Sequence, residues 1–174
     1  MKIAVFCDSV TGNTYKLAKC IYDTCKDCDV YFFKDFDLEM VDADIVFLGS
    51  YVKDMEPSDK FKKVLRLIID KDVFLYGTCS FDNDRDYYDI IYKNFLKYVP
   101  NSNRILGYFF CNGKLPYSYR MKYEARLRIN PRDNVSKEKL ENFDLVLKHP
   151  DYSDLMDLKL RVRMILDSLS NKYI

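Results

Sequence analysis

Short runs of apolar residues alternate along the chain with longer amphipathic stretches. Five of these runs have the length of buried strands, and they lie at Ile3–Cys7, Val30–Phe33, Ile45–Gly49, Val73–Gly77 and Ile105–Phe110. Runs that stay apolar without alternation are typical of strands buried on both faces of a parallel sheet. This pattern predicts an α/β domain built on a five-stranded parallel sheet.

The stretches between the apolar runs repeat their apolar residues at helical spacing. The first places Leu17 and Ile21 on one face, and the second places Phe61 and Leu65 on one face. A third helix is predicted over about residues 86–98. Because parallel strands need crossover connections, these helices are expected to cover the two faces of the sheet.

After the fifth apolar run the pattern changes. Residues 114–150 are basic, contain three prolines and are expected to form two short helices. A last helix is predicted over about residues 153–169, with Asp151 or Ser153 as its N-cap. A length of 174 residues suits one domain, so residues 1–174 are expected to form a single domain in which 114–150 are an extension.

Composition narrows the class of protein. The net charge of +1 argues against general nucleic-acid binding. No apolar run reaches the length of about 18 residues that a membrane helix needs, and the first residues do not form a signal peptide. The six cysteines are then expected to be reduced thiols in a cytoplasmic protein without membrane contact.

Charge is distributed unevenly along the chain. Residues 1–58 contain six basic and eleven acidic residues, whereas residues 114–174 contain thirteen basic and nine acidic residues. Between Tyr117 and Arg128 basic and aromatic residues are interleaved. This segment is either a docking surface for a redox partner or a solvated helix face packed on the domain.

The first predicted strand and the first predicted helix are joined by Ser9-Val10-Thr11-Gly12-Asn13-Thr14. A helix N-terminus offers unpaired N–H groups to an anion, and the hydroxyl groups add further donors. The spacing is neither that of a Walker A loop nor that of the glycine-rich dinucleotide fingerprint. The loop is therefore a candidate phosphate site of another kind, or an ordinary turn rich in capping residues.

Three loops of the chain resemble those of one family in the same order. Ser9–Thr14 resembles the FMN phosphate loop of flavodoxins, and Gly49–Val52 and Tyr76–Cys79 resemble the two loops that flank the flavin ring. Phe109–Lys114 and His149–Asp151 resemble features of a flavodoxin subgroup with an extended C-terminal part. The resemblance implies a flavodoxin-like, doubly wound three-layer sandwich with strand order 2-1-3-4-5.

The resemblance also implies that one FMN lies at the carboxyl ends of the strands. Tyr51 is expected against one face of the isoalloxazine ring and Phe81 against the other, because flat aromatic rings stack favourably. Thr78, Cys79 and Ser80 are expected along the edge of the ring. The implied cofactor-binding residues are Ser9, Val10, Thr11, Gly12, Asn13, Thr14, Ser50, Tyr51, Val52, Thr78, Cys79, Ser80 and Phe81.

The function implied in this way is transfer of electrons from FMN to a partner reductase by a monomer or weak dimer. No catalytic residue and no metal ligand is assigned. One alternative is an FMN-dependent reductase or oxidase of a small substrate such as a quinone, a tetrapyrrole or a bilin, because the fold does not choose between carrier and enzyme. The other alternative is a flavin-free regulatory protein of the same fold.

Overall fold

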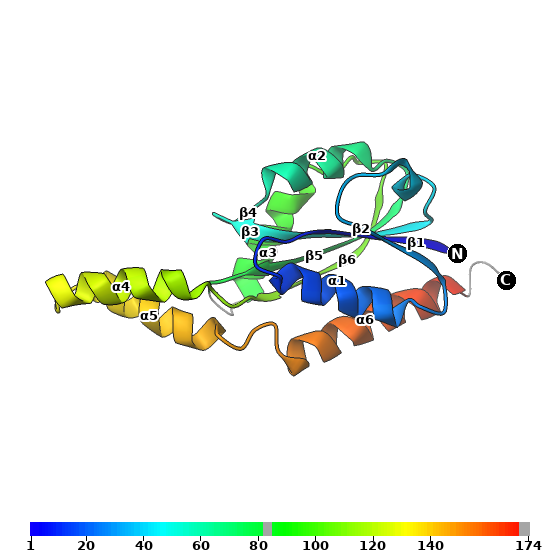
Figure 1. Ribbon diagram of the computed structural model, residues 1–174. Coiled ribbons are helices and arrows are strands. Elements are labelled where there is room, and N and C mark those ends of the chain that lie inside the picture. Colours follow the sequence, from blue (N-terminus) through cyan, green and yellow to red (C-terminus); the bar gives the residue numbers. More distant parts are fainter. Residues whose placement is uncertain (82–84, 171–174) are drawn as a thin grey trace.

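The structure is a computed structural model and describes residues 1–81 and 85–170 (Figure 1). Within these residues, parallel strands form one sheet in the order β2-β1-β3-β5-β6. The strands are β1 (Lys2–Asp8), β2 (Asp29–Phe33), β3 (Ile45–Lys53), β5 (Asp72–Cys79) and β6 (Arg104–Asn112). Since β4 is only a short hairpin strand, this is the predicted order 2-1-3-4-5, and the predicted fold is confirmed.

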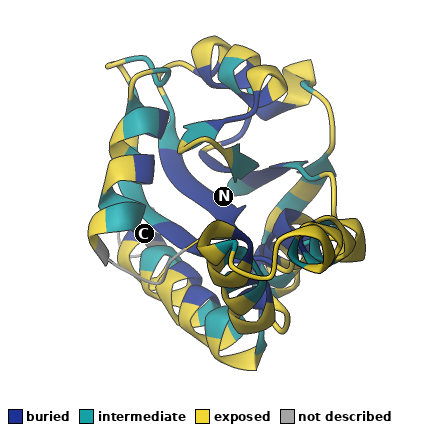
Figure 2. Cartoon of the chain, turned by 90° about the vertical axis from the view of Figure 1, so that its left-hand side faces the viewer, coloured by how far each residue is buried: buried dark blue, intermediate teal, exposed yellow. Residues whose placement is uncertain are grey.

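Helices cover both faces of the sheet. Figure 1 shows α1 (Asn13–Thr24) and α6 (Tyr152–Ser170) below the sheet and α2 (Asp59–Leu67) above it. Helix α3 (Arg85–Leu96) packs into the same apolar layer as α2. Figure 2 shows the buried strands enclosed by helices whose outer faces are exposed. Each face of the sheet therefore forms its own apolar layer with its own pair of helices.

The pleat of the strands distributes side chains between the two layers, because successive residues of a strand point to opposite faces. In β1, Ile3 and Val5 join the layer under α1 and α6. Ala4 and Phe6 join the layer under α2 and α3. All four are almost completely buried. The continuous apolar runs of the sequence thus reflect strands that are covered on both faces.

Two elements were not predicted from the sequence. A 3-10 helix, η1 (Leu38–Met40), follows β2, and a two-residue strand, β4 (Glu56–Pro57), pairs antiparallel with the end of β3. The turn between β3 and β4 consists of Asp54 and Met55, with φ values of 53° and 61°. Such turns usually contain glycine, so the ordinary sequence signal for a hairpin is missing here.

The helix ends differ by a few residues from the prediction. Helix α2 begins at Asp59 because Ser58 Oγ accepts the N–H of Phe61 at 3.1 Å, which makes Ser58 the N-cap. At α6 the carboxylate of Asp151 accepts the N–H of Asp154 at 3.0 Å. Asp151 is therefore the cap, which confirms one of the two predicted candidates.

Residues 114–150, called the arm from here on, contain α4 (Tyr117–Ile129) and α5 (Asn134–Val146). These two helices pack against each other and extend beyond the carboxyl end of the sheet (Figure 1). The two predicted helices are therefore present, and with 13 residues each they are longer than expected. Their shared core is thin, which weakens the helical pattern in the sequence. No helix of the described residues is both long and apolar enough to span a membrane.

Candidate cofactor site

The loop between β1 and α1 ends in an uncapped helix N-terminus. Gly12 is the N-cap residue and has φ 83°, a left-handed conformation that favours glycine. Having no side chain, Gly12 cannot accept an N–H group of the first turn. Ser9 Oγ accepts the N–H of Tyr15 at 3.3 Å, so one N–H group of the first turn already has a partner. Because Gly12 caps no other N–H group, the rest of the first turn and the positive helix dipole remain available to an anion.

Asn13, the first residue of α1, is 4% exposed and carries a buried acceptor without a donor. Its Nδ2 donates to Thr11 Oγ1 and to the carbonyl of Lys114, both at 2.9 Å. Its Oδ1 is buried and has no hydrogen-bond partner among the described residues. Because an unsatisfied buried acceptor is costly, this atom indicates that a donor comes from a bound molecule.

The space around Asn13 is kept open by a glycine at the end of β6. A Cβ added to Gly113 would lie 2.6 Å from Asn13 Nδ2, which is closer than van der Waals contact allows. The N–H of Gly113 also donates to the carbonyl of Cys79 at 2.6 Å. Gly113 therefore lets the β6 end approach the phosphate loop without displacing the amide of Asn13.

Hydrogen bonds join the loops at this edge of the sheet. Thr14 Oγ1 and Thr78 Oγ1 lie 2.8 Å apart, which links the start of α1 to the end of β5. Ser80 Oγ donates to the carbonyl of Gly113 at 2.8 Å. The carbonyl of Ser80 accepts Nδ2 of Asn142, also at 2.8 Å, so the arm is fastened to the same edge.

These loops surround a cavity of about 460 Å³. That volume lies in the range of roughly 300–1,000 Å³ that is usual for small-molecule sites. The cavity opens where carboxyl ends of parallel strands meet, the usual ligand position in this kind of sheet. The lining residues are Val10, Thr11, Asn13, Tyr51, Val52, Lys53, Thr78, Ser80, Lys114, Leu115 and Pro116.

The structure brings seven of the thirteen predicted residues into this cavity wall: Val10, Thr11, Asn13, Tyr51, Val52, Thr78 and Ser80. Gly12 and Thr14 lie at the start of α1 beside it, and Ser50 and Cys79 are buried at the ends of β3 and β5. Ser9 lines a neighbouring cavity on the other side of the phosphate loop. Apart from Phe81, the set thus lies around the phosphate loop and the ends of β3 and β5.

Phe81 lies outside the cavity wall described above. Its side chain is 50% exposed, and Lys139 Nζ lies 4.8 Å from the centre of its ring. The ring of Tyr87 approaches it to 6.1 Å. Leu115 and Pro116, which the sequence argument did not select, line the cavity instead. The only signal that could have found them is their position directly after the fifth strand, where the carboxyl edge of the sheet lies.

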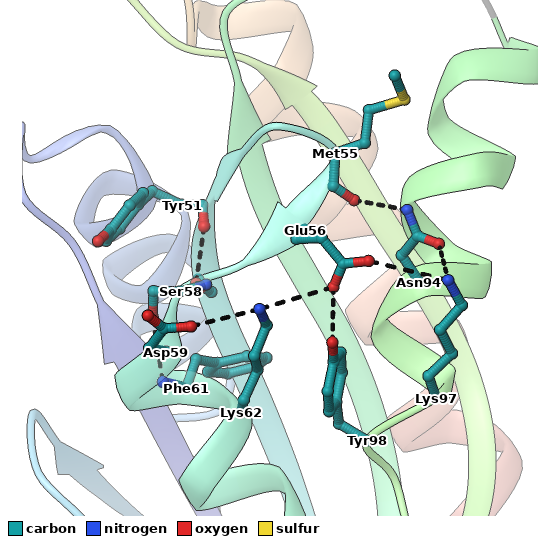
Figure 3. A network of polar contacts seen from close by, with 11 residues as sticks. Tyr51, Met55, Glu56, Ser58, Asp59, Phe61, Lys62, Asn94, Lys97 and Tyr98 are labelled. Carbon is teal, nitrogen blue, oxygen red and sulfur yellow. Dashed lines mark hydrogen bonds and ion pairs between the residues drawn. The ribbon is translucent and has the colours of Figure 1, made fainter.

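The hairpin beside the cavity is held by a polar network (Figure 3). Asn94 Nδ2 of α3 donates to the carbonyl of Met55 at 2.8 Å. Glu56 accepts the hydroxyl of Tyr98 at 2.9 Å and lies 3.8 Å from each of the ammonium groups of Lys62 and Lys97. These contacts fix the turn that follows the cavity residues Val52 and Lys53.

Charge at the site favours an anionic ligand. Lys53 and Lys114 line the cavity. Burial, followed by the neighbouring carboxylate of Asp8, raises the pKa of Cys7 to about 12, so this thiol adds no negative charge beneath the phosphate loop. The carboxylate of Asp8 accepts the hydroxyl of Ser58 and is thereby engaged at the start of α2.

An open parallel sheet with a crevice at its carboxyl edge and an uncapped first helix defines a flavodoxin-like α/β protein. The model of the flavodoxin domain family matches residues 4–174, and the chain belongs to that family. A flavodoxin-like domain-containing protein, BilS, of Clostridioides difficile strain CD3 is 32% identical over 161 residues, covering 90% of this chain and 92% of the relative.

Solved structures share the fold at low sequence identity. A flavodoxin from the domain Archaea superposes with a TM-score of 0.56 at 13% identity, covering 98% of this chain and 99% of that one. The apo form of an NADH:FMN oxidoreductase gives a TM-score of 0.57 at 13% identity, covering 96% of this chain and 89% of that one. The same architecture thus occurs in a flavodoxin and in an oxidoreductase, and function must be argued from the site.

Proposed function

We propose that this chain binds FMN and transfers electrons from it to a partner reductase. The observation that carries the proposal is the cavity of about 460 Å³ that adjoins the uncapped start of α1 and the unpartnered acceptor of Asn13. A ligand that fits has a phosphate at one end, hydroxyl donors next to it and a flat ring beyond. FMN has these parts in this order, and membership of the flavodoxin family supports the choice.

Different residues of the chain would bind different parts of FMN. The N–H groups at the start of α1, with the hydroxyls of Ser9 and Thr11, would hold the phosphate. Asn13 Oδ1 would accept a hydroxyl of the ribityl chain. Tyr51 would pack against the ring, and Lys53 would place a positive charge near it. FMN supplies the electron chemistry, while the protein binds, orients and shields it.

The free thiols suit a reducing compartment, and we place the protein in the cytoplasm. Within the described residues, no disulfide joins any two of the six cysteines Cys7, Cys20, Cys25, Cys28, Cys79 and Cys111. Burial is the main cause that raises the pKa values of Cys7, Cys25 and Cys111, so these thiols stay protonated near neutral pH. They therefore resist oxidation without contributing a redox pair of their own.

The first test is an anaerobic titration of the purified chain with FMN, followed by quenching of flavin fluorescence. We expect saturation at one FMN per chain. Asn13→Ala removes the buried acceptor and should weaken binding by about tenfold, which corresponds to about 1.4 kcal/mol. Asn101→Ala, at an exposed turn before β6, is the matched control and should bind FMN like the unchanged protein. A chain that never binds FMN would refute the proposal.

The second test separates a carrier from an enzyme. The FMN-loaded chain is mixed anaerobically with NADH or NADPH, alone and with a small quinone. A carrier should show no sustained turnover until a reductase partner is added. Steady turnover of the nicotinamide nucleotide and the quinone without any other protein would overturn the carrier assignment and establish the enzyme.

A further inference from the structure

The arm begins in the cavity wall and extends beyond the sheet before it returns. Lys114, Leu115 and Pro116 line the cavity, and α4 starts at the next residue, Tyr117. A helix of 13 residues is about 20 Å long at 1.5 Å per residue. Helix α4 therefore continues directly from the cavity wall, and it lies on the side of the arm nearer to β3 and β4 (Figure 1).

The outward side of α4, which carries Met121, Ala125 and Ile129, leaves large apolar side chains in solvent. Met121 and Ile129 are 59% and 88% exposed. Tyr117 is 64% exposed but lies next to α5, where its ring is 6.5 Å from that of Phe143. The opposite face is the one that packs, where Tyr123 is 9% exposed. Large side chains left in solvent on one helix face mark an interaction site more often than isolated ones do.

Unpaired cations border this apolar stripe. Lys122 lies on one side and Arg128 on the other, and Arg132 follows at the tip of the arm. In the described part of the chain none of these three forms an ion pair with a carboxylate. The one acidic residue of α4, Glu124, already accepts Nε of Arg120 at 2.7 Å.

Helix α6 offers a useful contrast. It also exposes apolar residues, among them Leu160 at 53% and Met164 at 70%. However, its exposed surface mixes charges of both signs, and one of its cations, Arg161, is paired with Asp157. Helix α6 also does not continue from the cavity wall. Helix α4, in contrast, combines exposed apolar residues, cations that form no ion pair among the described residues and direct continuity with the candidate cofactor site; Lys122 Nζ lies 5.5 Å from the centre of the Tyr123 ring.

We propose that the outward face of α4 is the docking surface for a partner protein whose own surface is acidic around an apolar centre. This inference rests on the proposed electron-transfer function and names the chemistry of the partner. The cations would steer an acidic surface toward the cavity, and the apolar stripe would hold it there. Docking on α4 would bring the partner to the opening from which electrons leave.

The test uses cytochrome b5, a small acidic haem protein, as the probe. Cytochrome c, a small basic haem protein, is the control of opposite charge. Binding is measured by calorimetry at low and at high salt, with the full chain both free of FMN and loaded with it. We expect cytochrome b5 to bind at low salt and to dissociate as salt rises, because salt screens exposed charges. Cytochrome c should not bind in this way.

Two matched variants carry the same change in net charge. The arm variant combines Lys122→Glu, Arg128→Glu and Arg132→Glu. The control variant changes three exposed residues elsewhere and combines Lys26→Glu, Lys63→Glu and Arg163→Glu. The arm variant should weaken binding of cytochrome b5 by about tenfold or more, and the control variant by much less. Equal losses in the two variants would show that only net charge matters and would overturn the proposal.

A second pair of variants examines the apolar stripe. Met121→Gln with Ile129→Gln should weaken binding about threefold, and this loss should persist at high salt because it is not electrostatic. Leu160→Gln with Met164→Gln, on α6, is the control and should leave binding unchanged. Circular dichroism and proteolysis confirm that each variant remains folded.

Three other results would each reject the acidic partner. If sedimentation shows a dimer that the arm variant dissociates, the occupant is a second copy of this chain. If the chain binds vesicles of phosphatidylglycerol through the arm but not cytochrome b5, the occupant is a membrane surface. If neither probe protein binds, α4 is a solvated helix. Because docking is measured without FMN as well, failure to bind FMN is recognised separately.

Discussion

The sheet and the arm bury their side chains in different ways. Each face of the sheet has a broad apolar layer, with Phe47 and Phe61 among residues that are fully buried. The arm relies on a few buried residues, chiefly Tyr123, Phe143 and Val146, together with the contacts of Arg120 with Glu124 and Asp144. The sheet can therefore support a precise site, whereas the arm can change its surface at little cost.

The largest expected difference comes from removing one aromatic ring in each region. Phe47→Ala should lower the free energy of unfolding by about 3–5 kcal/mol, because it leaves a cavity between the sheet and its helices. Phe143→Ala should instead promote local unfolding of the arm and lower the free energy of unfolding of the sheet by less than about 1 kcal/mol. Urea denaturation measures the first effect, and limited trypsin digestion within residues 114–150 detects the second. Equal effects on global unfolding would contradict the comparison.

The junction of the two regions should give the next largest effect. Gly113→Ala places a methyl group 2.6 Å from Asn13 Nδ2 and so displaces the amide that joins the phosphate loop to Lys114. We expect FMN affinity to fall by about tenfold and the free energy of unfolding to fall by about 1–3 kcal/mol. Ser118→Ala, at an exposed position one turn into the arm, is the control. Unchanged FMN affinity in Gly113→Ala would show that the junction does not support the site.

Backbone strain in the hairpin next to the cavity predicts a smaller change in stability, and here the substitution should stabilise the protein. Met55 has φ 61°, which costs a non-glycine residue about 1 kcal/mol and persists because Asn94 and Glu56 hold the turn. Met55→Gly should therefore raise the melting temperature by about 2–4 °C. Met55→Ala, which keeps a Cβ, should not. A lower melting temperature in the glycine variant would mean that the methionine side chain contributes more than the strain costs.

The smallest effect concerns one cap in the arm. Asp133 caps α5 by accepting the N–H of Ser136 at 3.1 Å, and hydrogen bonds from Ser136 lower the pKa of Asp133. A carboxyl group whose pKa is lower in the folded chain than in the unfolded chain stabilises the folded state at pH values above the unfolded pKa of about 3.9. This stabilisation is lost as the pH falls through the pKa of the folded chain. Asp133→Asn caps equally well but does not titrate.

The two proteins should therefore have equal helicity at neutral pH and diverge only below about pH 4, where the unchanged protein loses arm helicity first. Far-UV circular dichroism between about pH 6 and pH 2 measures this. A difference already present at neutral pH would show that the charge acts on something other than the cap.

The fold could be predicted because strands covered on both faces leave long apolar runs such as Ile45–Leu48, which few other arrangements produce. The turn from β1 into α1 could be predicted because its signals are local, with Ser9, Gly12 and Thr14 close together in the sequence, while its role in binding phosphate stays a prediction. Leu115 and Pro116 could not be assigned to the cavity, because only the path of the arm after β6 brings them there.

Phe81 shows what the sequence leaves open. Its expected place against the ring stays a prediction, because the sequence does not reveal that Lys139 of the arm lies 4.8 Å from the centre of its ring. The β3–β4 hairpin was missed for a related reason. Its turn has Asp54 and Met55 where glycine is usual, and it is held by α3, an element distant in the sequence.

The two ends of the arm meet. The N–H of Lys114 donates to the carbonyl of His149 at 2.8 Å, so the chain leaves the sheet and returns to it at nearly the same point. An insertion that starts and finishes at one place adds little loop-closure cost to the rest of the fold, whatever its length. The length and the surface residues of this segment can therefore change without altering the rest of the fold. A change in the length or surface of the arm would then leave the strand order of the sheet intact.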